Sequence, residues 1–496
     1  MLPESGNFGD LFANRRDSGA TAIVDLTGAQ PREVSYAELN AGCDAVARGL
    51  RRAGLEPGDR VAVMSANSVA FVEAFFGAAR AGCIPLQVNI KLPDATLATV
   101  VERGDAKLAF VDAKRRDKVP AGTPAIVLDG DGYTDFADPG PFESHRPDPS
   151  EIAFQPYTSG TTGVPKGIMM SHGGVLSGIA AMHPPQRPLD PTTRIIIAHP
   201  LYHKNAMLAA KSVFLQGGAL VMFERFEVEG YLRAIQDHKV TNLQTVPTMM
   251  ALIMQRRDLL DRLDLTSLRF ILIGSAPLSE KLQAQVTEAF PWCMVRNGYG
   301  FTEAGVAIFG NHPDGKPPPP LSIGYVLPDC EVKLVGGPNP NQGVLYVKNP
   351  RLMAGYHKLP DVTAERLTSD GFANTGDVVR RDAEGFYYFV GRDDDMFVVG
   401  GYNLYPATVE ETLLQHPAVH QAAVVAVDDE IKGTLPHAFV VPKRGQTITE
   451  DEIKQFALNE APAYQHPRRV YVVDELPLAG TNKIDYRRLR EQVRRD

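Results

Sequence analysis

The chain has 496 residues, of which 44% are hydrophobic, so it is long enough to bury more than one core and to form two or more domains. Its net charge of −8 argues against a basic surface for nucleic acid. Its four cysteines lack CxxC or paired-histidine spacing, which argues against a disulfide framework and a zinc site, and no run of about 20 apolar residues predicts a membrane span or a signal peptide. We therefore expect a cytoplasmic protein without nucleic-acid partners, as a monomer or a homodimer.

Helix and strand patterns alternate along the first part of the chain. Residues 33–59 have helical apolar spacing that ends at a Pro-Gly-Asp turn, and residues 60–65 form a short apolar strand pattern. The same order recurs at 68–82 and 83–88, at 231–240 and 241–247, and at 279–290 and 292–300. Alternation of this kind predicts α/β sheets covered by helices.

The composition changes between about residue 315 and residue 350. A proline run at 316–320 is followed by two β-rich stretches, EVKLV and GVLYVKN, which flank GGPNPNQG. Such short strands around a glycine- and proline-rich turn predict a small β-barrel or hairpin module.

A further break follows GFYYFVGRDDD at 385–395. Beyond it, helical patterns at 407–419 and 449–461 alternate with strand patterns at 420–427, 437–443 and 468–477. About 100 residues of this kind are enough for a small α+β domain. We predict an N-terminal domain at 1–393 and a C-terminal domain at 394–496, with the boundary at Asp394.

The stretch YTSGTTGVPKG at 157–167 combines small hydroxyl residues, glycines and one lysine. A glycine-rich turn lets backbone N–H groups and short hydroxyls close on phosphate oxygens, while a lysine supplies positive charge. Apolar runs at 152–156 and 167–171 predict a strand on each side, and the spacing is not that of a Walker A loop. The alternative is a flexible surface loop, because glycine with serine or threonine is common in linkers.

YTSGTTGVPKG resembles the signature of the adenylate-forming superfamily, which includes acyl-CoA synthetases, adenylation domains of peptide synthetases and firefly-type luciferases. The resemblance extends over essentially the whole chain. It continues in NGYGFTEAG at 297–305, in the TGD and GRDDD elements between 375 and 395, in GGYNLYP at 400–406 and in GTNKID at 480–485. It implies a large N-terminal domain of α/β sheets plus a small β-barrel, followed by a mobile, smaller α+β domain.

The resemblance also implies a reaction. A carboxylic acid would attack ATP to form an acyl-adenylate and pyrophosphate, and coenzyme A would then displace AMP to give a thioester. The implied activity is that of an AMP-forming carboxylate–CoA ligase acting on a small or aromatic organic acid. Two alternatives stay open: transfer of the acyl group to a carrier-protein phosphopantetheine or an amine, and a non-catalytic nucleotide-binding relative.

The resemblance assigns ATP and Mg²⁺ contacts to specific residues. Glu303 would hold Mg²⁺ beside Thr302 at the α-phosphate, while Asp377 and Arg392 would contact the ribose. The triphosphate would be held by Thr158, Ser159, Gly160, Thr161, Thr162 and Lys166. Adenine would be enclosed by Gly274, Ser275, Ala276, Asn297, Gly298 and Tyr299.

Lys483 is the residue that we expect to catalyse the first step. By resemblance it would lie between the substrate carboxylate and the α-phosphate and would stabilise charge on both. The alternative is an ordinary surface lysine, because KIDYRRLREQVRR is a basic segment of the kind that usually faces solvent.

The second step would use different residues after the small domain rotates about Asp394. Gly400 and Gly401 would leave room for the thiol-bearing arm of coenzyme A, or they form only a hairpin turn. Arg468 would contact the CoA nucleotide, or it faces solvent.

The acyl pocket is assigned from HPLYHKNAM at 199–207, where His203 would gate the pocket unless it is a hydrogen-bonded core histidine. Ser275, Gly298 and Ala304 would line the same pocket. Lys204 would face a second polar group of the substrate if it points inward, whereas outward it would have no role. The stretch lacks the aspartate that peptide-synthetase domains use to hold an α-amine, which argues against an amino-acid substrate.

Overall fold

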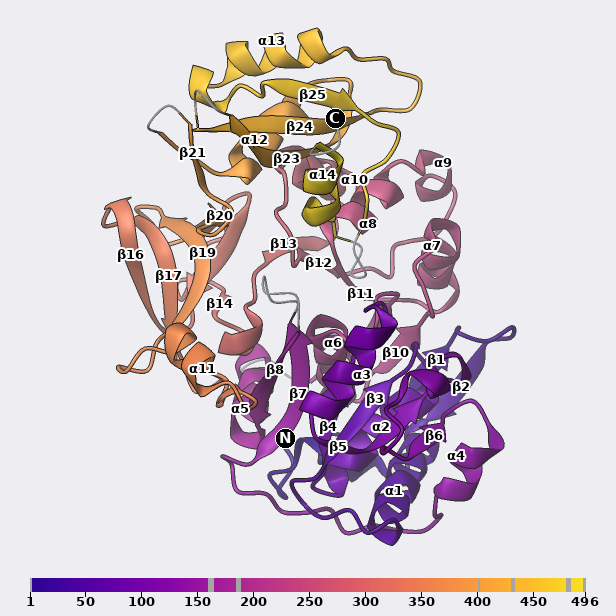
Figure 1. Ribbon diagram of the computed structural model, residues 1–496. Helices are drawn as coiled ribbons and strands as arrows, with labels where there is room; N and C mark the ends of the chain where they lie inside the picture. The colour runs from indigo at the N-terminus through magenta and orange to yellow at the C-terminus, as the bar shows by residue number, and fades with distance from the viewer. Residues whose placement is uncertain are drawn as a thin grey trace.

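The structure is a computed structural model that describes residues 2–158, 165–183, 189–399, 402–429, 433–478 and 483–493. Figure 1 shows a large body formed by the first part of the chain, a separate group of strands at its side, and a smaller C-terminal body beyond both. The predicted site residues Ser159, Gly160, Thr161, Thr162, Gly400 and Gly401 lie outside the described residues.

The first sheet joins seven of the described strands in the order β18-β8-β7-β4-β3-β5-β6. Their bounds are β3 Arg60–Met64, β4 Ile84–Gln87, β5 Ala106–Val111, β6 Ala125–Val127, β7 Ile152–Thr158, β8 Lys166–Ser171 and β18 Gly355–Tyr356. The helix α1 (Tyr36–Arg52) precedes β3, while α2 (Val69–Arg80) connects β3 to β4 and α3 (Asp94–Arg103) connects β4 to β5. The predicted strands at 60–65 and 83–88 and the predicted helix at 68–82 are confirmed.

The start of the first predicted helix is wrong. Residues Arg32–Ser35 form strand β2, and α1 begins only at Tyr36. Ser35 caps the helix, because its side chain accepts the N–H of Glu38 while the Glu38 carboxylate accepts the N–H of Ser35. The helical apolar pattern therefore extends over a short edge strand that precedes the helix, and the cap at Ser35 marks where the helix begins.

The second sheet has the order β13-β12-β11-β9-β10-β1-β2 among the described residues. Its strands are β1 Thr21–Asp25, β2 Arg32–Ser35, β9 Arg194–Ile197, β10 Ala219–Met222, β11 Asn242–Thr245, β12 Phe270–Gly274 and β13 Met294–Gly298. All neighbours pair in parallel except β1 and β2. The helices α4 Asp131–Phe136 and α5 His172–Met182 follow the first-sheet strands β6 and β8, and the helices of this part are α6 Lys204–Gln216, α7 Val228–Asp237, α8 Pro247–Met254, α9 Arg257–Leu260 and α10 Glu280–Ala289.

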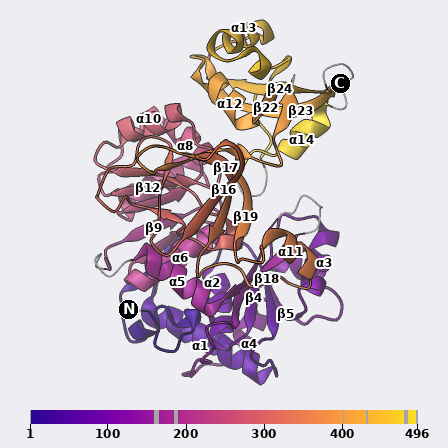
Figure 2. The same cartoon turned by 90° about the vertical axis from the view of Figure 1, so that its left-hand side faces the viewer.

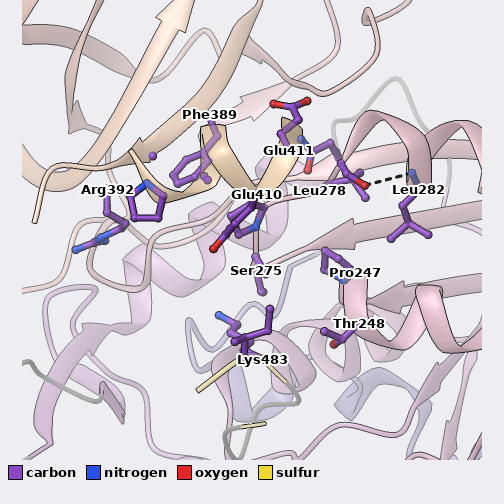
Figure 3. Close-up of a pocket in the computed structure, with 18 of the residues that line it drawn as sticks. Pro247, Thr248, Ser275, Leu278, Leu282, Phe389, Arg392, Glu410, Glu411 and Lys483 are labelled. Atoms are coloured by element: carbon purple, nitrogen blue, oxygen red, sulfur yellow. Dashed lines mark hydrogen bonds between the residues drawn. The ribbon is translucent and has the colours of Figure 1, made fainter. Parts of the chain in front are cut away.

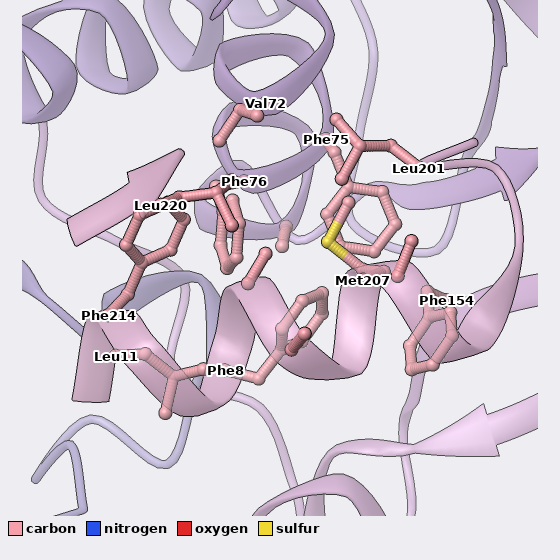
Figure 4. Packing of buried hydrophobic residues seen from close by; sticks show 14 of the residues in the cluster. Phe8, Leu11, Val72, Phe75, Phe76, Phe154, Leu201, Met207, Phe214 and Leu220 are labelled. Atoms are coloured by element: carbon pink, nitrogen blue, oxygen red, sulfur yellow. The ribbon is translucent and has the colours of Figure 1, made fainter. Parts of the chain in front are cut away.

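A shared apolar core holds these elements together. Phe75 and Phe76 of α2 and Phe214 of α6 are fully buried, and the Phe76 and Phe214 rings lie 5.9 Å apart. Figure 4 shows Phe8 and Phe154 in the same cluster. Because burial of one such side chain contributes about 1.5–3 kcal/mol, this cluster fixes α2 against α6. It thereby fixes the N-terminus of α6, where His203 and Lys204 lie.

The third sheet is antiparallel, with the order β14-β15-β20-β19-β17-β16. Its strands are β14 Phe309–Gly310, β15 Ser322–Val326, β16 Glu331–Asn339, β17 Gln342–Lys348, β19 Ala373–Arg381 and β20 Tyr387–Arg392, and α11 (Pro360–Arg366) precedes β19. Within the described residues β14 and β16 end this order and do not pair with each other, so the predicted small barrel is not confirmed. The module also extends well beyond residue 350, because β17 pairs with β19.

The last sheet lies in the C-terminal body, which Figure 2 shows beyond α8 and α10. Its strands are β21 Phe397–Val399, β22 Tyr402–Leu404, β23 Val419–Asp429, β24 Gly433–Pro442 and β25 Arg469–Val472. The helices α12 (Pro406–Gln415), α13 (Glu450–Glu460) and α14 (Tyr486–Val493) complete it. The chain enters this body between Arg392 and Phe397, and the exact domain boundary at Asp394 stays a prediction. No helix in the described part of the chain is both long and apolar enough to cross a membrane.

Candidate active site

A cleft of about 1620 Å³ opens between the ends of β12 and β13, the antiparallel sheet and the C-terminal body. Figure 3 shows Arg392, Ser275 and Lys483 among its lining side chains. The predicted residues that line it are Thr158, Lys166, Ser275, Ala276, Asn297, Gly298, Tyr299, Thr302, Glu303, Asp377, Arg392, Asp394 and Lys483. Residues more than 300 positions apart therefore meet at one cleft.

The floor of the cleft is formed where β12 and β13 end side by side. Gly274 pairs with Gly298, and a Cβ atom added at Gly274 would lie 2.5 Å from the carbonyl oxygen of Gly298. Only glycine fits this close approach. The next residue, Ser275, has a positive φ of 67° and lines the cleft beside Asn297. The two strand ends thus leave a bare edge against which a flat group can lie.

Asp377 is the centre of a hydrogen-bonded group on one wall. The Tyr299 hydroxyl donates to its Oδ2 at 2.5 Å, and Arg392 donates to its Oδ1 at 2.9 Å. Arg392 also donates to Asp394 at 2.8 Å. Burial raises the pKa of Asp377 above its ordinary value, although Tyr299 and Arg392 oppose that change. The carboxylate is therefore held in one orientation on this wall, next to the segment that leads into the C-terminal body.

Glu303 is buried, with 5% of its surface exposed, and is oriented by a residue from a distant strand. The Tyr356 hydroxyl donates to Glu303 Oε1 at 2.7 Å. The Lys166 ammonium lies 5.4 Å from the centre of the same Tyr356 ring. Lys166 of the hydroxyl-rich stretch and Glu303 of NGYGFTEAG therefore both contact the same residue, Tyr356.

Lys483 enters the cleft from the segment before α14. Burial lowers its pKa below the ordinary value of 10.5, and the charge of Asp377 opposes this change. The segment is anchored nearby, because the Tyr486 hydroxyl donates to buried Glu410 of α12 at 2.9 Å. Lys483 is thus a partly desolvated cation that faces the wall with Asp377.

The residues assigned to an acyl pocket are spread around α6 and the turn after β13. His203 is half-buried, and burial, followed by nearby His199 and Lys483, lowers its pKa to about 3. Ala304 is fully buried and packs in the core beneath the turn. Lys204 points to the back of that turn, where its ammonium donates to the carbonyl oxygens of Thr302 at 2.5 Å and Gly305 at 3.0 Å.

Of the residues assigned to coenzyme A, the structure describes Arg468, which lies in the C-terminal body. The strands β21 and β22, which precede and follow the undescribed positions 400 and 401 in the sequence, pair antiparallel. The Arg468 backbone N–H donates to Pro436, and its guanidinium lies 3.5 Å from His466 Nδ1. These placements leave the assignments to coenzyme A as predictions.

Sequence reasoning missed two groups of residues. Tyr356 reaches Glu303 because β18 pairs with β8 across the first sheet, and its local sequence has no signal for that pairing. Asn205 donates to Ser275 Oγ at 3.3 Å and accepts from Gln244, which places two amides beside the floor of the cleft. Asn205 follows His203 and Lys204, which the sequence did predict as site residues. Its own place beside the cleft is shown only by its hydrogen bonds to Ser275 and Gln244.

Comparisons with known proteins give consistent findings. A family model described as AMP-binding enzyme matches residues 12–357, and one described as AMP-binding enzyme C-terminal domain matches 408–483. 4-Coumarate–CoA ligase 2 of Nicotiana tabacum is 30% identical over 493 residues, which cover 94% of this chain and 91% of that protein. ATP-bound MatB from Rhodopseudomonas palustris is 27% identical with a TM-score of 0.88, and 98% of each chain is covered. O-Succinylbenzoate coenzyme A synthetase (MenE) from Bacillus subtilis in complex with AMP is 27% identical with a TM-score of 0.83, again with 98% of each chain covered.

Proposed function

The chain belongs to the AMP-binding enzyme family, the adenylate-forming enzymes, and from this premise we propose how its cleft activates an acid. The protein is an ATP-dependent carboxylate–CoA ligase of the AMP-forming class. A carboxylate oxygen attacks the α-phosphorus of ATP and the bond to pyrophosphate breaks. The CoA sulfur then attacks the acyl carbon, the bond to AMP breaks, and the thiol proton is lost.

In the first step, Lys483 brings two anions together. It lies in the cleft near Asp377, where burial has already removed part of its water. A cation in this desolvated position stabilises the charge that builds up on the α-phosphate more strongly than a lysine in water does. Asp377 would accept hydrogen bonds from the ribose hydroxyls, with Tyr299 and Arg392 fixing its orientation.

The polyphosphate would lie between Lys166 and Glu303. Magnesium usually binds through one or two carboxylates together with substrate phosphates, and Glu303, oriented by Tyr356, offers such a carboxylate. The donor chemistry of this wall therefore fits Mg²⁺. The chemistry supplied by Mg²⁺ when bound is neutralisation of phosphate charge. Lys166 would supply a second positive charge, together with Thr158 and the assigned residues 159–162.

The second step would require the C-terminal body to move, because Lys483 now occupies the cleft. Asp394, paired with Arg392, lies where the chain leaves the antiparallel sheet. The moving body would break the contacts that Lys281 makes with the carbonyl oxygens of Leu414 at 2.7 Å and His416 at 3.1 Å. The arrangement in the structure thus fits adenylate formation, and rotation about Asp394 would bring Gly400 and Gly401 to the adenylate.

The acid is best described as a small or aromatic carboxylic acid. Two of the relatives named above are a 4-coumarate–CoA ligase and an O-succinylbenzoate coenzyme A synthetase. Asn205, Gln244 and Ser275 form a polar group beside the floor of the cleft. Ser275 is exposed to the cleft, and the donors and acceptors that these three side chains keep after bonding one another favour an acid with a hydroxyl, amine or second carboxyl group.

The observation that supports this mechanism best is the meeting of Lys483, Asp377 and Glu303 at one cleft. The test is CoA-dependent release of AMP over a panel of aliphatic, dicarboxylic and aryl acids. With an acid that reacts, Lys483→Ala should slow adenylation about 10³-fold, which corresponds to about 4 kcal/mol, while a supplied acyl-adenylate still reacts with CoA. Arg487→Ala, an exposed cation on α14, is the matched control.

Three results would contradict the proposal in different ways. Equal loss of both half-reactions in Lys483→Ala would remove this residue from its assigned role. Adenylate formation without consumption of CoA would favour a carrier protein or an amine as the acceptor. No pyrophosphate exchange with any acid would contradict adenylate chemistry itself.

A further inference from the structure

One face of α6 carries two lysines that the ligation mechanism does not use. Lys204, Leu208 and Lys211 are spaced four and three residues apart, so their side chains lie on the same face of the helix. All three line a small cavity of about 20 Å³ behind the turn that bears Glu303. The other walls are apolar side chains or glycines, namely Phe154, Met170, Gly174, Val175, Ile179, Gly305 and Val306.

Lys211 is the more deeply buried of the two lysines, with 3% of its surface exposed. Its ammonium lies 4.1 Å from the centre of the Phe154 ring and 5.7 Å from that of Phe8, two rings that Figure 4 shows in the core. In the described part of the chain no hydrogen bond or ion pair reaches this ammonium. A ring face compensates only part of the loss of water around a cation.

Lys204 is better satisfied but still has a free donor. An ammonium has three N–H donors, and Lys204 uses two of them on the carbonyl oxygens of Thr302 and Gly305. Lys211 uses none of its three on an oxygen of the described residues. Together the two side chains have four N–H donors without an acceptor among the described residues.

The charges around the cavity have one sign. No carboxylate is among the described residues that line it. Burial lowers the pKa of both lysines to about 7; the charge of Lys204 lowers the pKa of Lys211 further, whereas Glu303 opposes the change at Lys204. A negative charge between the two ammonium groups would relieve the desolvation and the repulsion together.

The size of the cavity limits what the occupant can be. About 20 Å³ holds one water-sized particle, and a carboxylate or phosphate group needs more room. We propose that this cavity binds a single small anion of halide type between the ammonium groups of Lys204 and Lys211. The anion would lie one side chain away from Thr302 and Glu303, because Lys204 connects the cavity to their turn.

The test measures thermal unfolding of the full chain, without ATP or acid, while sodium chloride replaces sodium gluconate at constant ionic strength. Because the anion would bind only the folded protein, Tm should rise with chloride and then level off as the site fills. Bromide should act in the same way. Lys211→Met, which keeps the length of the side chain and removes its charge, should abolish this rise. Lys114→Met, which removes an exposed lysine, should keep it.

The proposal is overturned if Tm of the unmodified chain is the same in chloride and gluconate, or if Lys211→Met keeps the full response. A crystal grown with bromide gives a readout that needs no variant: an anomalous peak between Lys204 Nζ and Lys211 Nζ supports the site, and its absence refutes it. None of these measurements requires the enzyme to turn over, so a failure here is separate from a failure of the proposed reaction.

Discussion

The pH dependence of stability should depend on Glu410, a buried carboxyl that anchors the segment of Lys483. Glu410 Oε1 accepts the backbone N–H of Val424 at 2.8 Å and the hydroxyl of Tyr486 at 2.9 Å. Burial raises the pKa of Glu410 from 4.5 to about 7, although both hydrogen bonds oppose this change. In the unfolded chain the carboxyl ionises near its ordinary pKa, so between these two values only the unfolded state releases the proton.

The sign and size of the effect follow from that difference. Glu410 carries no penalty below its unfolded pKa, where both states are protonated. As pH rises towards 7 the folded state loses about 3 kcal/mol relative to the unfolded state, and above that pH the loss stays constant. Glu410→Gln is neutral at every pH, and its amide oxygen can accept the same two hydrogen bonds. The variant should therefore match the parent near pH 4 and exceed its stability by up to about 3 kcal/mol near pH 8.

The assay is urea unfolding of both proteins across this pH range, followed by circular dichroism. Glu460→Gln, an exposed carboxyl on α13, is the matched control and should differ little from the parent at any pH. A stability difference between Glu410→Gln and the parent that does not change with pH would refute the reasoning. So would a variant that is less stable near pH 8, because the hydrogen bonds to the carboxylate would then outweigh its burial.

Three further variants test the cleft. Tyr356→Phe removes the hydroxyl that donates to Glu303 at 2.7 Å. It should raise the Mg²⁺ concentration needed for adenylation and lower kcat/KM for ATP roughly 10- to 100-fold. An unchanged Mg²⁺ titration would contradict this role of Tyr356. Asp377→Asn removes the charge paired with Arg392 and should raise KM for ATP in pyrophosphate exchange by about tenfold or more, whereas an unaltered KM would place the ribose elsewhere. Lys281→Met removes two hydrogen bonds to the C-terminal body. It should slow adenylation by roughly two- to fivefold relative to thioester formation from a supplied acyl-adenylate. If the ratio of these two rates is the same as in the parent, the two bonds do not hold the observed arrangement.

Local pattern was enough to predict most strands and helices of the first two sheets. The strand at Arg60–Met64 and the helix at Val69–Arg80 lie where their apolar runs predict them, because both runs are bounded by turns and are almost entirely buried. The apolar period predicted a helix at Arg32–Ser35, where the structure has an edge strand that leads directly into a helix. It also failed to show the extent of the antiparallel sheet, because β17 pairs with β19 across an intervening helix and loop.

Motif order predicted the chemistry of the cleft but not the groups that orient it. Lys166, Glu303, Asp377 and Lys483 all belong to recognisable stretches of sequence, and all line one cleft. Tyr356 belongs to none of them, since its place beside Glu303 depends on how β18 registers against β8. The same applies to the direction of Lys204, which depends on a turn almost 100 residues further along the chain.

The sequence alone therefore determined the class of reaction, the order of the α/β elements and the identity of the charged residues of the cleft. Each of these depends on a short stretch of sequence that can be recognised without the fold. The tertiary structure alone decided which groups are desolvated and which partners orient them. Burial and strand register arise only when distant segments pack together, and for that reason the lysine pair behind the turn of Glu303 became visible only in the folded chain.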